Sequence, residues 1–152
     1  KRSDRSIQRG DAQTLINNGN SPNGIVLDPQ DKVLFIAMTR ANCMWHAPLK
    51  PGGGVAKVGV YALLPGIHGP DGLAMDEAGN LAVAHPRVGI IWLFNPIGVP
   101  LLQIHSANKN SRMTNMAYGG ADGKTLFIVD SYSGSVLTAK MPVAGKRLYS
   151  HT

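Results

Sequence analysis

The segment Gly69-Pro70-Asp71-Gly72-Leu73-Ala74-Met75-Asp76 occurs in related form at two other places in the chain. One relative is Pro22-Asn23-Gly24-Ile25-Val26-Leu27-Asp28, and the other is the looser Thr114-Asn115-Met116-Ala117-Tyr118-Gly119-Gly120. Their polar residues stand at positions 23, 71 and 115, so the period is 48 and then 44 residues. A period of this size indicates a repeat architecture in which each repeat is one supersecondary unit.

The three repeats share one succession of strands separated by polar turns. First strands are expected near 24–28, 72–76 and 115–119, and second strands at Val33–Ala37, Leu81–Ala84 and Leu126–Val129. Third strands are expected around Met44-Trp45, Ile91-Trp92 and Val136-Leu137, and fourth strands at Val58–Leu64, Leu101–His105 and Arg147–Ser150. Four strands in about 45 residues is the signature of a β-propeller blade.

The composition of the 152 residues agrees with an all-β chain. Hydrophobic residues make up 43% and charged residues 16%, which excludes a disordered chain of low hydrophobicity and high charge. Eighteen Gly and ten Pro imply frequent turns, and helix-forming residues never run on for three turns, which excludes an α-helical bundle.

The repeats divide the chain into one partial propeller domain. We expect blades at 22–68, 69–112 and 113–152, with residues 1–21 forming outer strands of a preceding blade at Ser6–Gln8 and Thr14–Ile16. A propeller closes with about four to eight blades, so three blades leave two open edges that require a partner. The chain is therefore expected to be half of a ring, completed by a homodimer of half-propellers or by a missing N-terminal half of the same protein.

The charge distribution, the length of the apolar runs and the cysteine content indicate which partners and which cellular location to expect. The net charge is +6, but the basic residues crowd the two ends of the chain without a basic stripe between them, so we expect no nucleic-acid partner. The longest apolar run, Val88–Phe94, is far too short to cross a membrane, so we expect no membrane partner. The single cysteine, Cys43, favours a reducing compartment, and we expect a cytoplasmic location. The chain starts at Lys1, so the native N-terminus is not visible.

Polar residues from all three repeats are expected to gather at one rim. The first strand of a blade lines the channel and the second returns antiparallel, so the start of one lies beside the end of the other. The strand starts carry Asn23, Asp71 and Asn115, the returning strands end at Thr39, His85 and Asp130, and His68 lies in the loop entering the second repeat. Oxygen ligands at a narrow channel suit a divalent cation such as Ca²⁺. Water or further blades would supply the remaining ligands.

Other interpretations of these residues exist. Asn23-Gly24 and Asp71-Gly72 are also the dipeptides of tight hairpin turns. Asn115 precedes Met116, so the third repeat keeps the polar residue without the turn chemistry, which favours the channel interpretation. The histidines show no zinc spacing, and His85 before Pro86 fits a structural role better than a proton shuttle. No Gly-x-Ser-x-Gly elbow accompanies Ser131 or Ser133.

The same segments resemble a known family. Ser21–Leu27, Gly69–His85, and Thr114–Gly120 with Lys124–Ile128 are similar in order and spacing to the SMP-30/gluconolactonase/LRE-like lactonases, from about residue 20 onward. The resemblance corresponds to the C-terminal half of a family member. It implies a six-bladed propeller with one divalent metal in its channel.

The resemblance also implies roles for individual residues. Asn23 matches the family's metal-binding Asn, Asp71 matches its metal-binding Asp and general base, and Asn115 matches a channel-lining position. His68, His85, Thr39 and Asp130 are our further candidates for substrate or channel lining. The family's metal-binding Glu, and a further Asn on the substrate side, have no counterpart in these residues.

The function that follows is metal-dependent hydrolysis of a sugar lactone or related ester, with Ca²⁺ as the metal and a small-molecule lactone as substrate. The alternative is a non-catalytic half-propeller that serves as a binding or assembly module, because a fold does not fix a function. A propeller similar to strictosidine synthase is less well supported by the segment at Asp71.

Overall fold

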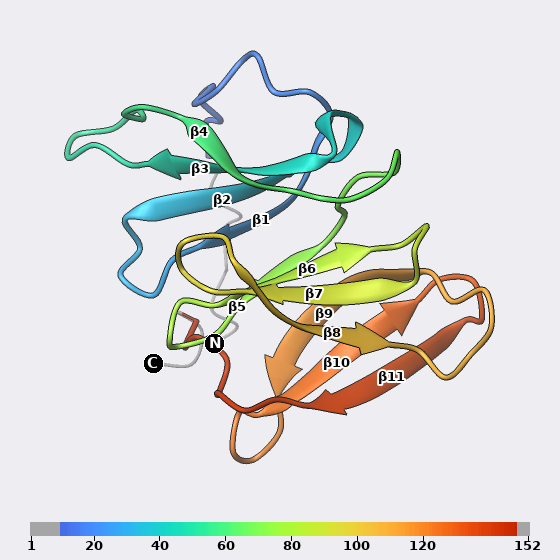
Figure 1. Ribbon diagram of the computed structural model, residues 1–152. Helices are drawn as coiled ribbons and strands as arrows, with labels where there is room; N and C mark the ends of the chain where they lie inside the picture. Colours follow the sequence, from blue (N-terminus) through green and yellow to red (C-terminus); the bar gives the residue numbers. More distant parts are fainter. Residues whose placement is uncertain (1–9, 149–152) are drawn as a thin grey trace, which may run out of the picture.

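The structure is a computed structural model, and it describes residues 10–148. Three antiparallel sheets follow one another along the chain and lie side by side in Figure 1. The first sheet holds β1 (Pro22–Leu27), β2 (Val33–Met38), β3 (Cys43–Pro48) and β4 (Gly59–Leu63). The second holds β5 (Leu73–Met75), β6 (Leu81–His85), β7 (Ile90–Phe94) and β8 (Pro100–His105). The third holds β9 (Met113–Gly119), β10 (Thr125–Asp130) and β11 (Ser135–Lys140).

The prediction of an all-β chain built from propeller blades is confirmed. Within the described residues, the only helical segment is the short 3₁₀ turn at Thr39–Ala41. Each sheet runs in chain order from an inner strand outward, and the inner strands β1, β5 and β9 contact one another in that order. The sheets are thus three blades of a β-propeller.

Aspartates at the ends of inner strands explain two of the hairpins. Asp28 Oδ1 accepts hydrogen bonds from the backbone N–H groups of Lys32 and Val33. Asp76 Oδ1 accepts from Ala78 and Asn80 in the same way. A short carboxylate that binds the backbone of a turn replaces the bonds which the strand ladder loses there.

Two predicted strands differ from the structure. No strand forms at Thr14–Ile16, and Ser6–Gln8 lie outside the described residues. The described part of Arg147–Ser150, residues 147 and 148, is not a strand either. The third sheet therefore has three strands among the described residues.

The C-terminal segment pairs with the second blade instead of the third. Gly145 forms an isolated bridge with Asp76, and the Lys146 N–H donates to the Met75 carbonyl at 2.9 Å. Pro142 follows Met141, whose N–H donates to Lys124, and a proline has no N–H with which to continue that pattern. The chain leaves the third sheet there and crosses to the end of β5.

The core lies between the blades. Alternate residues of β6 face opposite sides: Leu81 and Val83 pack toward the first sheet, and Ala82 and Ala84 pack toward the third. All four are fully buried, because the middle blade is covered on both faces. The small alanines let the second and third blades approach closely. This packing holds the starts of the inner strands at one rim.

Candidate functional site

Glycines after Asn23 and Asp71 let neighbouring inner strands touch. The Gly24 N–H donates to the Asp71 carbonyl at 3.0 Å, and the Gly72 N–H donates to the Thr114 carbonyl at 2.9 Å. A Cβ on Gly24 would lie 2.3 Å from the Asp71 carbonyl oxygen, which no side chain can tolerate. Neither glycine has a positive φ, which a type I′ turn requires. The hairpin-turn interpretation of these dipeptides is therefore wrong, and the glycines serve close backbone approach.

Asn23, Thr39 and Asp71 lie together at this rim. The Asn23 amide donates to Thr39 Oγ1 at 3.4 Å, and the Thr39 hydroxyl donates to the Pro70 carbonyl at 2.8 Å. Burial raises the pKa of the Asp71 carboxyl, and a hydrogen bond from the Asn23 side chain acts in the opposite direction. Asp71 is half-buried, whereas Asn23 is exposed. The first and second repeats thus contribute neighbouring side-chain oxygens, one of them from a carboxylate.

Asn115 takes the equivalent position in the third blade. Its side chain is exposed, and Oδ1 accepts a hydrogen bond from the Met116 N–H at 2.9 Å. The same oxygen would lie 2.4 Å from a Cβ on Gly72, so Asn115 sits directly beside the Asp71-Gly72 step. The three strand starts are therefore adjacent.

Both ring nitrogens of His85 are hydrogen-bonded to neighbouring residues. His85 is fully buried, and its Nδ1 accepts a hydrogen bond from Trp92 Nε1 at 3.3 Å. Its Nε2 therefore carries the proton and donates to the His68 carbonyl. Burial lowers the pKa of His85, which keeps the ring neutral. His85 holds the loop of His68 in place, and the His68 side chain itself is exposed.

The Asp130 carboxylate is hydrogen-bonded to the two loops that carry Arg112 and Tyr132. This buried carboxylate accepts hydrogen bonds from the Ser111 hydroxyl at 2.8 Å and from the backbone N–H groups of Arg112 at 2.9 Å and Tyr132 at 3.2 Å. These bonds, led by the one from Arg112, hold the pKa of Asp130 well below its usual range. Asp130 is ionised and fixes the loops around Arg112 and Tyr132.

Two adjoining depressions open at this rim. One has a volume of about 410 Å³, and Asp71, Thr39 and Arg40 are among its lining residues. The other, of about 570 Å³, lies between the second and third blades and is lined in part by Arg112 and Tyr132. Both depressions are also lined by His68 and Arg87.

The sequence did not point to the three arginines of this rim, Arg40, Arg87 and Arg112. Arg40 directly follows Thr39, and Arg87 comes two residues after His85. Both therefore occupy the loop between the second and third strands of their blades. Their equivalent position in the two repeats is the signal that could have identified them.

The described residues contain no group of three or more His, Cys, Asp or Glu side chains that could hold a metal ion. Among residues 10–148, no helix is long and apolar enough to cross a membrane.

Comparison with known proteins gives consistent matches. A profile described as "SMP-30/Gluconolactonase/LRE-like region" matches residues 4–132. The lactonase drp35 of Staphylococcus aureus is 35% identical over 94 residues, which are 59% of this chain and 29% of that protein. Diisopropyl-fluorophosphatase of Loligo vulgaris is 28% identical over 138 residues, which are 86% of this chain and 43% of that protein.

A solved structure shows the same fold. The calcium-binding protein regucalcin from Agrobacterium tumefaciens superimposes with a TM-score of 0.68 at 21% identity, over 84% of this chain and 48% of that one. The chain thus spans less than half the length of each of these three proteins.

Proposed function

Because the chain belongs to the SMP-30/gluconolactonase/LRE-like family, we propose that it supplies part of the active site of a metal-dependent lactone hydrolase. The relatives include lactonases, which supports lactone hydrolysis in general. The observation that carries the proposal is the half-buried Asp71 carboxylate beside the Asn23 carboxamide, at the start of two touching inner strands. The substrate is a sugar lactone or a related ester.

The donor set at this rim fits part of a calcium site. Ca²⁺ takes six to eight oxygen ligands, and carboxylate and carboxamide oxygens are among those it prefers. Asn23 and Asp71 would hold the cation, while water and further blades would complete its coordination. The calcium-binding regucalcin, which shares the fold, supports the choice of metal. A bound cation would polarise the lactone carbonyl as a Lewis acid.

The chain's own residues then act on water and substrate. Asp71 removes a proton from the attacking water, since a nearby cation favours its ionised form. The Asn23 side chain favours the ionised form of the Asp71 carboxyl, because it acts to lower the pKa of that group. Asn115, Thr39 and His68 line the space around the substrate, and His85 and Asp130 position the loops that border it. Ring opening needs no covalent intermediate in this scheme.

We expect chelation to remove lactone hydrolysis from the assembly that contains the closed ring, and Ca²⁺ to restore it. The reason is that the cation would polarise the lactone carbonyl as a Lewis acid in the proposed mechanism. The measurement is the rate of sugar-lactone hydrolysis, followed by acid release, before and after dialysis against a chelator.

Two results would contradict the proposal in different ways. Hydrolysis that survives chelation would remove the metal from the mechanism. A closed ring that binds Ca²⁺ and hydrolyses no sugar lactone would favour the alternative, a non-catalytic binding or assembly module.

The ring itself needs further blades. The outer face of the third blade exposes Phe127, Val129 and Val136, with 41%, 43% and 69% of their surface accessible. The first blade exposes Ile25 (61%) and Val60 (55%) on the face away from the second blade. Apolar faces of this kind invite pairing with another blade.

We propose that the three blades that lie within 22–68, 69–112 and 113–141 form half of a closed ring. The other half is a second copy of this chain or a further segment of the same protein. The protein is placed in the cytoplasm in this proposal, on the grounds of its single cysteine.

Sedimentation of the purified 152-residue chain checks the closure. We expect association into a dimer, or exposure of apolar surface and poor folding when the other half is absent. A well-folded monomer at micromolar concentration, with both outer faces in water, would contradict closure.

A further inference from the structure

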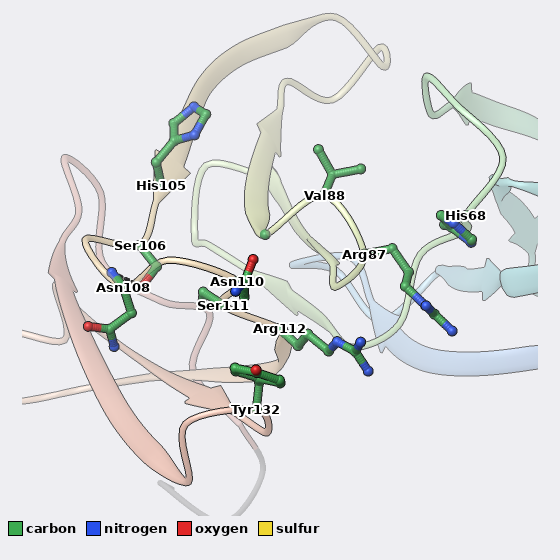
Figure 2. A pocket seen from close by; sticks show the side chains of 11 residues that line it. His68, Arg87, Val88, His105, Ser106, Asn108, Asn110, Ser111, Arg112 and Tyr132 are labelled. Atoms are coloured by element: carbon green, nitrogen blue, oxygen red, sulfur yellow. Dashed lines mark hydrogen bonds between the residues drawn. The ribbon is translucent and has the colours of Figure 1, made fainter.

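The larger rim pocket carries positive charge that the proposed hydrolysis does not use. It lies between the second and third blades, and its lining includes Arg87, Arg112 and His68. Figure 2 shows the side chains of Arg87 and Arg112 extending toward the same side of the pocket, with Tyr132 next to Arg112. Neither aspartate nor glutamate lines this pocket.

Neither arginine has a carboxylate partner among the described residues. The two salt bridges found there join Lys140 to Asp122 and Lys146 to Asp31, at the other end of the blades. Asp130 is the carboxylate nearest the Arg112 backbone, but its oxygens are buried and accept hydrogen bonds from Ser111, Arg112 N–H and Tyr132 N–H. Two guanidinium groups on one side of a pocket repel each other, and an anion between them relieves that repulsion.

The arginines are held in place. The Arg112 guanidinium carbon lies 5.6 Å from the centre of the Tyr132 ring, a cation–π contact. The Arg112 backbone is fixed on both sides, since its N–H donates to Asp130 and its carbonyl accepts from the Ser131 N–H at 3.0 Å. Arg87 lies in a tight turn closed by a bond from the Gly89 N–H to the His85 carbonyl at 3.0 Å. Less side-chain and loop freedom is therefore lost when a ligand binds.

Neutral donors complete the lining. Asn108 and Asn110 contribute carboxamides from the loop that leads into β9, and Ser106 contributes a hydroxyl. Planar guanidinium groups with amide donors match the geometry of carboxylate and phosphate oxygens.

We propose that this pocket binds the carboxylate or phosphate group of a small ligand, and that this ligand is the substrate. The assignment of this ligand as the substrate rests on the proposed function, whereas anion binding does not. The pocket and the depression at Asp71 share His68 and Arg87. A ligand anchored by its anionic group therefore extends toward Asp71, where the lactone ring is opened.

Anion binding is tested on the 152-residue chain by titrating inorganic phosphate and, separately, succinate at constant ionic strength. Binding is followed by NMR shifts of the Arg87 and Arg112 side-chain N–H groups. We expect saturable binding of at least one anion, and each of the variants Arg87→Gln and Arg112→Gln to weaken it about tenfold, or about 1.4 kcal/mol.

The matched control is Arg147→Gln, which removes the same charge at the opposite end of the blades and is expected to leave affinity unchanged. Saturation by phosphate alone, or by succinate alone, identifies the group that the pocket takes. The proposal is overturned if neither anion binds saturably, or if Arg147→Gln weakens anion binding as much as Arg87→Gln and Arg112→Gln do.

The substrate role has its own readout in the complete assembly. We expect Arg87→Gln to raise KM about tenfold for a lactone that carries the bound type of anion and to leave an uncharged lactone unaffected. Equal effects on both lactones would overturn the substrate role. If no lactone is hydrolysed, the proposed function and the substrate role fail together, and the titration with phosphate and succinate still decides anion binding.

Discussion

Replacing Asp71 with alanine is expected to abolish lactone hydrolysis in the closed assembly. The variant removes the carboxylate of the candidate metal site and the proposed general base at once. General acid–base catalysis alone contributes about 10²- to 10⁴-fold, so kcat/KM should fall by at least about a hundredfold. Steady-state hydrolysis of a sugar lactone at saturating Ca²⁺ measures this loss.

Two further variants make the Asp71 result interpretable. Asp71→Asn keeps a side chain that can bond to Asn23 but removes the charge, and it should lose nearly as much activity as the alanine variant. Asp122→Ala removes an exposed carboxylate from a turn of the third blade and should keep full activity. Undiminished hydrolysis by the Asp71 variants, with circular dichroism like that of the original chain, would exclude Asp71 from the mechanism.

Replacing Gly72 with alanine should destabilise the chain strongly. The added Cβ would lie 2.4 Å from Asn115 Oδ1 and 2.8 Å from both Asn115 Cα and the Thr114 carbonyl oxygen. Two of these three atoms belong to the backbone of the neighbouring inner strand, so a side-chain rotation cannot relieve the clash. We expect the free energy of unfolding to fall by about 3 kcal/mol, as in severe overpacking. Urea unfolding followed by tryptophan fluorescence measures it.

The control for Gly72 is Gly10→Ala. No heavy atom of the described residues lies within 4 Å of a Cβ built at Gly10, so the same substitution should leave stability within about 0.5 kcal/mol. If Gly72→Ala unfolds at the same urea concentration as the original chain, the inner strands do not touch as described. That result would also contradict the close approach of Asp71 and Asn115.

The blade pattern was predictable because it depends on neighbours along the chain. Alternating burial along β6, and turns made by Asp28 and Asp76 with their own hairpins, follow from residues only a few positions apart. The same locality explains why the polar residues at 23, 71 and 115 could be placed at one rim, since antiparallel hairpins fix which strand ends meet.

The identity of a residue at the rim did not reveal its role there. Gly24 and Gly72 carry the signal of a hairpin turn, and only the approach of the next inner strand shows that they serve a different purpose. The sequence placed His85 and Asp130 at the ends of returning strands and, for His85, favoured a structural role, but it did not identify their partners. In the structure His85 accepts a hydrogen bond from Trp92 and donates one to the His68 carbonyl, while the Asp130 carboxylate accepts from the Ser111 hydroxyl and from loop backbone N–H groups.

Local sequence patterns were enough to predict three β repeats, their order and the polar residue that starts each inner strand, because propensity and period-two burial act over a few residues. Tertiary packing alone brings Arg87 and Arg112 to one pocket between two blades and joins Gly145 to Asp76. Such contacts link segments far apart in the chain, and they form only after the buried faces of β6 have drawn the three sheets together. Local sequence patterns do not indicate which distant loops this packing places side by side.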